Sequence, residues 1–450
     1  MNKRHLSSGS MTIILLSLMY SFGTFGFLNL LGARTIVQIA LIALIAFLAV
    51  FFIAMNVKLK VKHVSLVLVF SSLYAIGTLI HGNQITGFLD VYILIFVLVC
   101  LFYAPPQNII FFAKALVVVT TLLCILIAIA FIYYSIYPDE FMSANYHIYD
   151  STVGHKNIYP GNFMDWVSFT SGDGYVFNGH SIQRLKGYSN EPSSTVVHYV
   201  APAIIAFILG GRFLYLGIFI LVVNVVAIGS FTTYIILFLS VVFLMLKILP
   251  KRLSSFLLTM TVLFFILLIL QPNLMFPLFN YFSAEAINFA GFDLLSRKIG
   301  DGSVNNSTLG VRQQGILDGM RLALFSPMGY SADKLGAGAG LFYIISSKTG
   351  WVGIFIFGFF IARLIKNIKL IFYMRSSLIL TYGVSLLLAI LLISLFVSGY
   401  GWSRPPGMIM FLLFFRVLQI ITVEKEALPK NMLNRLFGNP PKKSSNLISR

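Results

Sequence analysis

The chain has 450 residues, of which 58% are hydrophobic and only 10% are charged, and its formal net charge is +18. Long apolar runs follow one another along nearly its whole length, which excludes a soluble globular protein. The basic residues are spread between these runs instead of forming one patch, which argues against a nucleic-acid-binding surface. We therefore expect an all-α polytopic membrane protein.

A helix that crosses a bilayer needs roughly 20 mostly apolar residues, and about twelve segments meet this requirement. They lie near residues 11–31, 35–55, 63–80, 86–104, 108–137, 193–209, 213–229, 231–248, 254–270, 341–362, 377–398 and 406–422. The basic N-terminus precedes an apolar run without a small-residue cleavage site, so we interpret that run as a retained first helix. Residues 1–450 are thus expected to form a single integral membrane domain.

The basic residues predict the orientation of these helices. They follow the second, sixth, eighth and tenth spans: Lys58, Lys60, Lys62, Arg212, Lys247, Lys251, Arg252, Arg363, Lys366, Lys369 and Arg375. The N-terminal Lys3 and Arg4 and the basic tail at 423–450 fall on the same side if the helices alternate. By the positive-inside rule this side is the cytoplasm, so both termini are expected there.

Two long loops, residues 138–194 and 271–338, fall on the opposite side. They hold eleven of the fourteen acidic residues, six in the first loop and five in the second. We expect short amphipathic helices in these loops, and we expect the polar chemistry of the protein to be concentrated there. Asp90 lies inside a predicted span, where it is either a structural partner, for example of Lys348, or a catalytic group.

The first loop is rich in aromatic, amide and histidine side chains. Aromatic rings next to amides suit sugar recognition, but an interfacial aromatic belt has the same composition. The histidines lack the spacing of metal ligands, so no metal site is expected. Cys100 and Cys124 fall within predicted spans and read as small buried apolar residues.

The most informative stretch runs from Arg184 to Ser194, where the first loop enters the sixth span. Pro192 suits the first turn of a helix, and Asn190 or Glu191 can cap that turn. The free N–H groups and the positive end of the helix dipole would then face a loop that carries Arg184 and Lys186. The sequence predicts an anion-binding site at this junction.

A short turn, Gly229-Ser230-Phe231-Thr232-Thr233, precedes the eighth span on the same side. Its hydroxyl groups suit a cap of the following helix.

The second loop contains a predicted amphipathic helix over Thr308–Phe325, which Ser326-Pro327 ends. Ile316, Met320 and Leu324 are spaced to share one apolar face. Arg312 and Arg321 are nine residues apart and therefore lie on opposite sides of this helix. Arg321 has Asp318 as an i, i+3 partner, whereas Arg312 has none, which makes Arg312 the preferred functional arginine. The glycine-rich 336–340 stretch reads as a hinge.

With these features, the chain resembles the bacterial O-antigen and capsular polysaccharide polymerases (Wzy-type) and the related O-antigen ligases. The resemblance rests on the helix layout with two long outer loops and on four short motifs. The motifs are Arg184…Gly187…Asn190-Glu191-Pro192-Ser193, Gly229-Ser230-Phe231-Thr232, Arg312 ahead of Ser326-Pro327-Met328-Gly329, and Lys348-Thr349-Gly350-Trp351. The ligases carry a histidine shortly after the Pro-x-Gly turn, and here residues 337–348 contain none.

The resemblance implies glycosyl transfer at the periplasmic face of a bacterial inner membrane, without a metal or other cofactor. Donor and acceptor would be glycans on undecaprenyl diphosphate, and a chain-length regulator would be a further partner. Arg184 and Arg312 would clamp the diphosphate as negative charge develops on it. Glu191 either takes the acceptor proton or caps the helix, ion-paired to Arg184 or Lys186. The expected substrate-binding residues are Lys186, Tyr188, Asn190, Ser193, Arg321 and Lys348.

Two other functions stay open at this stage. An O-antigen ligase would pass the finished glycan to lipid A core, and a lipid-linked oligosaccharide flippase would move the substrate without lengthening it. The missing histidine weighs against the ligase. Charges gathered in outer loops and the lack of an internal repeat weigh against the transporter.

Overall fold

The computed structural model describes residues 8–21, 101, 104–137, 146–149, 156–159, 168–177, 180–187, 196–270, 308–330, 340–373, 377–396 and 405–427. The predicted spans 35–55 and 63–80 and nearly all of 86–104 lie outside these residues. Most of the described chain is helical. The helices are α1 (Ser8–Ser21), α6 (Pro106–Ile136), η1 (Val196–Val200), α8 (Ala201–Leu209), α9 (Arg212–Val223), η2 (Asn224–Ile228), α10 (Phe231–Ile248), α11 (Lys251–Leu270), α14 (Thr308–Phe325), α15 (Leu341–Tyr373), α16 (Leu378–Phe396) and α17 (Pro405–Ala427), where η marks a π-helix.

Two of these helices have the length and apolar composition of a membrane span, Pro106–Tyr133 and Leu378–Leu395. Four shorter apolar helices accompany them in the described part of the chain: Val196–Leu209, Arg212–Ile228, Thr232–Ile248 and Pro406–Thr422. Helix α6 has 31 residues, so at 1.5 Å per residue it is roughly 46 Å long and exceeds a hydrocarbon core of about 30 Å. The expectation that this span tilts or projects fits that length.

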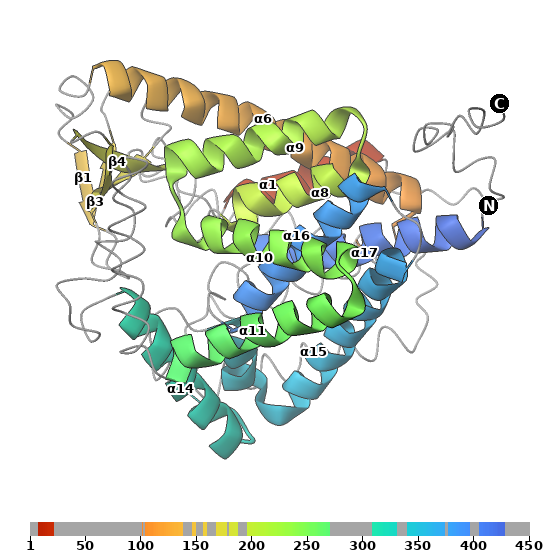
Figure 1. The fold of residues 1–450 in the computed structure, drawn as a ribbon. Helices are drawn as coiled ribbons and strands as arrows, with labels where there is room; N and C mark the ends of the chain where they lie inside the picture. The colour runs from red at the N-terminus through yellow and green to blue at the C-terminus, as the bar shows by residue number, and fades with distance from the viewer. Residues whose placement is uncertain are drawn as a thin grey trace, which may run out of the picture.

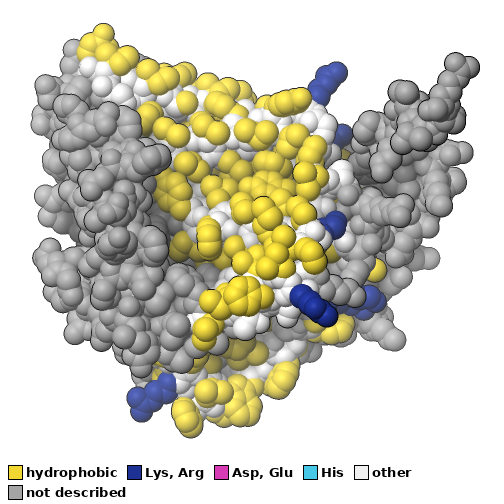
Figure 2. All heavy atoms as spheres, viewed as in Figure 1, with side chains coloured by type: hydrophobic (Ala, Val, Ile, Leu, Met, Phe, Trp, Pro, Cys, Tyr) yellow, Lys and Arg dark blue, Asp and Glu magenta, His cyan; other side chains and the backbone are white. Residues whose placement is uncertain are grey.

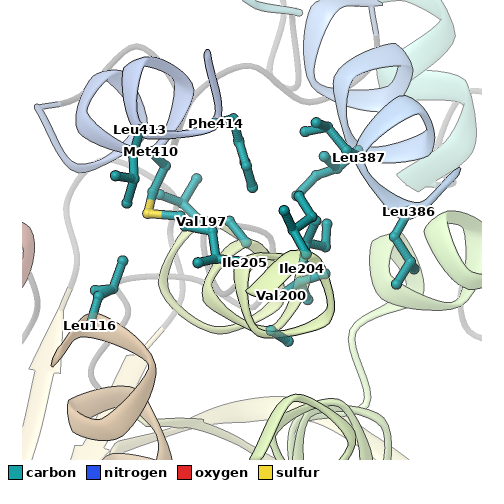
Figure 3. Close-up of a cluster of buried hydrophobic side chains, with 14 of the residues drawn as sticks. Leu116, Val197, Val200, Ile204, Ile205, Leu386, Leu387, Met410, Leu413 and Phe414 are labelled. Carbon is teal, nitrogen blue, oxygen red and sulfur yellow. The ribbon is translucent and has the colours of Figure 1, made fainter. Parts of the chain in front are cut away.

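Helices α8 and α16 form the centre of the described helices (Figure 1). Every residue of α8 before Leu209 is buried, and the helix packs against α6, α9 and α16. Figure 3 shows Leu116 of α6, Ile204 and Ile205 of α8, Leu387 of α16 and Phe414 of α17 converging on one cluster. Such interlocked apolar side chains hold helices together through many small dispersion contacts, in lipid as in water.

Tight turns between α8 and α11 place consecutive helix ends on alternate sides (Figure 1). Gly210 and Gly211 both have positive φ, 67° and 57°, which allows the chain to reverse between α8 and α9. The turn before α9 and the turn between α10 and α11 lie at one end, and they carry Arg212, Lys247 and Arg252. The η1 segment and the η2–α10 turn lie at the other end.

The described residues of the first loop do not have the predicted structure, because they form a sheet and no helix. Four strands, β1 (Tyr146–Tyr149), β2 (Lys156–Tyr159), β3 (Ser168–Phe177) and β4 (His180–Gly187), pair antiparallel in the order β1-β2-β3-β4. Phe177 pairs with His180, so two residues connect β3 and β4. The sequence there is Asn178-Gly179, which strongly favours a two-residue hairpin turn. The all-α expectation is therefore wrong for this loop.

In the second loop, the predicted helix is confirmed with its expected bounds, as α14 (Thr308–Phe325). The predicted buried face is wrong, because Ile316 is buried but Met320 and Leu324 are 41% and 66% exposed. The buried face instead follows Gly315, Ile316, Gly319 and Ala323. Gly319 has no side chain at this contact because the Tyr343 ring of α15 lies directly on it, and a Cβ atom there would come within 2.6 Å of the ring.

Candidate functional site

Strand β4 places the predicted anion-binding residues next to the helices. Leu185 is fully buried in the hydrophobic core, and the strand packs against α6 and η2. Arg184 and Lys186 flank Leu185, so their backbone is held at the end of α9 where η2 begins to turn. Their side chains lie outside the described residues, as do Tyr188, Asn190, Glu191 and Ser193. The roles of these six residues stay predictions.

Next to β4, the described chain contains a buried cluster of polar groups that we call the donor cluster. It consists of Asn224, Ser230, Thr232 and Thr233, whose side chains are all less than 9% exposed. The Thr233 hydroxyl donates to the Asn224 Oδ1 atom at 2.7 Å, which fixes the orientation of the amide. The Asn224 Nδ2 group is buried and has no hydrogen-bond partner among the residues that the structure describes. An unpaired buried donor costs about 1–3 kcal/mol, so this amide is suited to an acceptor oxygen that binds there.

The first turn of α10 adds backbone donors to this cluster. The N–H groups of Thr233 and Tyr234 donate to the Ser230 carbonyl at 2.9 and 3.3 Å. The N–H groups of Phe231 and Thr232 do not donate to any backbone carbonyl of the described residues. The predicted cap is wrong for Ser230, whose side chain makes no capping hydrogen bond. The turn is therefore an uncapped helix N-terminus, where dipole and free N–H groups favour negative charge.

Two π-helical turns produce this arrangement. In η2 the chain widens so that the Gly229 N–H donates to the Asn224 carbonyl at 3.0 Å, and Gly229 then takes the left-handed conformation with φ 58° and ψ 39°. Segment η1 begins the sixth span and buries His198, which is 7% exposed. Single π-turns inside apolar helices are frequent at functional sites because they redirect side chains. Here they bring polar residues to the end of the helices that faces the sheet.

The second candidate region is the packing of α14 against α15. Positions 312 and 319 are seven residues apart, about 20° short of two full turns, so position 312 lies on the same side of α14 as Gly319. The Arg312 side chain lies outside the described residues. Arg321 is exposed, and by helical spacing it lies on the opposite side of α14 from position 312, so the expectation that the two arginines do not share a face stays a prediction. Lys348 is half-buried in α15.

Helix α15 breaks two residues after Lys348. Gly350 has φ 60° and ψ −157°, and a Cβ atom there would lie 2.1 Å from the Pro327 carbonyl oxygen. Pro327 has no N–H and leaves the Ala323 carbonyl of α14 without its usual i+4 donor. The Trp351 indole Nε1 atom donates to that carbonyl at 2.8 Å, and the Trp351 backbone N–H donates to the Pro327 carbonyl at 3.0 Å.

Tyr330 bonds the turn after α14 to the part of α15 that precedes Gly350. Its backbone N–H donates to the Ser347 carbonyl at 2.8 Å, and its hydroxyl donates to the Tyr343 carbonyl at 2.9 Å. Burial raises the pKa of Tyr330 to about 12, so the hydroxyl remains a donor at any ordinary pH. The turn after α14 is thus bonded to α15 on both sides of the break.

The described residues do not test the predicted arginine clamp. The sheet and α14 both lie at the left of the helices in Figure 1, at the end opposite to the α10–α11 turn, but they are separated in that view. Strand β4 contacts α6 and η2, whereas α14 contacts α15. Whether Arg184 and Arg312 meet across this end stays a prediction.

Sequence reasoning missed Asn224 and His198. Both are polar residues inside otherwise apolar runs, and that signal alone identifies them as costly to bury and worth explaining. Comparison with known proteins gives no further guide, because no family model, curated protein or solved structure matches the chain.

Proposed function

We propose that the chain is a membrane glycosyltransferase that polymerises undecaprenyl-diphosphate-linked oligosaccharide repeat units into O-antigen or capsular polysaccharide. The observation that carries this proposal is the donor cluster at the first turn of α10, which β4 adjoins through η2. It offers fixed, buried hydrogen-bond donors to an oxyanion at one end of a set of apolar helices. The proposal includes about twelve spans in total, cytoplasmic termini and a periplasmic site.

In the proposed reaction, the acceptor hydroxyl oxygen attacks the anomeric carbon of the donor glycan. The bond between that carbon and the diphosphate oxygen breaks, and its electron pair stays on the diphosphate. Glu191 takes the proton of the acceptor hydroxyl. Guanidinium groups suit the resulting charge, because Arg stays protonated and its planar fork matches phosphate oxygens.

Each group in the site has a proposed role. Arg184, Lys186 and Arg312 stabilise the diphosphate, and the Asn224 amide and the α10 N-terminus add neutral donors to the same oxygens. Tyr188, Asn190 and Ser193 contact the glycan, and Lys348 reaches the site from α15. Removing one donor of this kind typically raises the barrier by about 2.7–4 kcal/mol.

The test is a gel of surface polysaccharide from cells that carry Arg184→Ala, Glu191→Ala or Arg312→Ala. For each variant, the amount of the protein in the membrane is first shown to match that of the unchanged protein. We expect single-repeat glycan in place of the normal ladder. Arg252→Ala is the matched control, because Arg252 is exposed at the opposite end of the helices. Normal ladders from all three site variants would refute the assignment. Total loss of surface glycan on deletion of the whole chain would indicate the ligase instead.

One observation favours a second candidate, a flippase for the same lipid-linked substrate. Helix α15 is broken at Gly350, and broken helices form the binding sites of many transporters. Purified protein in vesicles separates the two functions. Lipid-linked repeat units that cross the bilayer without lengthening indicate the flippase, and lengthened glycan indicates the polymerase.

A further inference from the structure

Helix α14 carries large exposed apolar side chains on the side that does not pack against α15. On this side, Met320 is 41% exposed, Leu324 66% and Phe325 79%, and Met328 in the following turn is 85% exposed. Arg321 is exposed beside them. Asp318 lies on the same side, so large apolar side chains share it with charged ones, whereas a helix of a water-exposed loop carries mainly polar residues there.

These side chains are not needed for packing within the chain. The contact with α15 is already made by the opposite face, where Tyr343 packs on Gly319 and Ile316 and Ala323 are 4% and 6% exposed. Helix α14 therefore carries large apolar side chains on both sides. One side packs against protein, and the other leaves Met320, Leu324 and Phe325 exposed to whatever surrounds the described chain.

The outward face continues into the exposed face of α15. Trp351, Val352 and Phe355 are 45%, 53% and 75% exposed. The Trp351 indole bonds to the Ala323 carbonyl, so the end of α14 is fastened beside these residues. In Figure 2, hydrophobic side chains cover the described surface down to the lower end, where α14 lies in Figure 1, and a basic side chain borders them.

We propose that α14 lies in the interfacial layer of the membrane, where Met320, Leu324, Phe325 and Met328 insert among the lipid chains and Arg321 pairs with headgroup phosphates. A helix with an apolar face and a flanking cation binds lipid in this way, because the long Arg side chain can reach the headgroups while its stem stays in the apolar layer. Exposed tryptophan at the same level is typical of a membrane–water boundary.

Lipid fits this face better than a protein partner does. The face joins the exposed apolar residues of α15, which a bilayer covers at the same time, whereas a protein partner would have to cover both helices. Arg321 thus interacts with lipid phosphate instead of the glycan substrate. The inference rests on membrane location alone and holds for a polymerase or a flippase.

Fluorescence quenching in proteoliposomes tests this placement. Met320→Cys, Leu324→Cys, Phe325→Cys and Met328→Cys are made one at a time in the full chain with Cys100→Ser and Cys124→Ala, and labelled with an environment-sensitive dye. The vesicles contain phosphatidylethanolamine and phosphatidylglycerol. We expect quenching by lipids with a spin label on the acyl chain and little quenching by aqueous iodide. The control Arg252→Cys, at an exposed turn, should show the reverse.

Arg321 is tested in the same vesicles with the label at Leu324→Cys. Arg321→Ala should shift quenching from lipid towards iodide, and Arg321→Lys should restore most of the lipid quenching. Iodide access at all four labelled positions would overturn the proposal, and so would protection that appears only when a second protein is added. Neither result depends on glycan synthesis. The placement of α14 can therefore fail while the proposed function stands, and the proposed function can fail while the placement of α14 stands.

Discussion

Two regions at the same end of the helices differ in how their backbone groups are bonded. The donor cluster buries polar groups, and the Asn224 Nδ2 group has no hydrogen-bond partner among the described residues. The α14–α15 unit, from Gly315 to Trp351, also buries a group that is unpaired within the described part of the chain, the Tyr343 hydroxyl, so unpaired side chains alone do not separate the two regions. Their backbones do: α10 begins without a side-chain cap, whereas the break in α15 is bonded to the turn after α14. An open helix N-terminus suits an anionic ligand and bonded backbone groups suit support. We therefore assign chemistry to the first region and mainly positioning to the second.

The largest expected effect comes from Gly350→Ala, which tests the supporting region. The new Cβ atom would lie 2.1 Å from the Pro327 carbonyl, and φ of 60° is strained for any residue with a side chain. Strain of this kind alone costs about 1–3 kcal/mol, and the clash adds to it. We expect loss of most folded protein, measured by size-exclusion chromatography of detergent extracts.

Gly358→Ala is the matched control for this change. Gly358 lies in the same helix, and a Cβ atom there meets nothing within 4 Å. Its protein level should be normal or slightly higher, because Ala favours a helix over Gly by about 1 kcal/mol. A Gly350→Ala protein as stable as this control would show that the break can close.

Asn224→Asp tests the chemical region. The remaining oxygen can still accept from Thr233, but the Nδ2 donor is replaced by a second oxygen. We expect polymerisation per amount of folded membrane protein to fall about 10²–10³-fold, as when one oxyanion donor is removed, and the protein level itself to fall as well, because a buried carboxylate is costly. Ser240 lies in α10, away from the donor cluster, so the control Ser240→Ala should leave the gel ladder intact. A normal ladder from Asn224→Asp would remove this amide from the site.

Gly319→Ala tests the ring contact between α14 and α15. The added methyl group would lie 2.6 Å from the Tyr343 ring, and overpacking costs typically about 1–3 kcal/mol, partly offset by the better helix propensity of Ala. We expect a lower melting temperature by intrinsic fluorescence. In a Tyr343→Ala background the same change should be neutral or stabilising, and a further loss there would contradict the contact.

The elements that have a local sequence signal could be predicted from the sequence. Predicted span 108–137 is α6, span 231–248 is α10 with the same bounds, and α14 begins at Thr308 and ends at Phe325 as expected. Length, apolar content and a stop such as Ser326-Pro327 are local properties, so they can be read without knowing the neighbours. The Asn178-Gly179 pair is also a local signal, for a two-residue hairpin turn. It was overlooked because an all-helical membrane protein was expected.

The remaining features depend on distant partners. The bond between Thr233 and Asn224 needs a π-turn, which has no clear sequence signal. The buried side of α14 was mispredicted because Met320 and Leu324 look like core residues, and only the position of Tyr343 explains why Gly319 takes their place. The site prediction rests on Arg184, Glu191 and Arg312, and no described contact yet joins them.

The smallest effect is expected from Trp351→Phe, which tests whether the indole replaces the donor that Pro327 lacks. The change removes the 2.8 Å bond to the Ala323 carbonyl and keeps an aromatic ring at the position. An orphaned carbonyl costs about 1–3 kcal/mol when buried, and less here because water or lipid headgroups reach a partly exposed site. Since Pro327→Ala supplies a new backbone N–H at position 327, Trp351→Phe should cost less in that background. Equal losses of melting temperature in both backgrounds would show that the indole contributes by packing alone, and that the α14–α15 unit is held by ring contacts and not by closed hydrogen bonds.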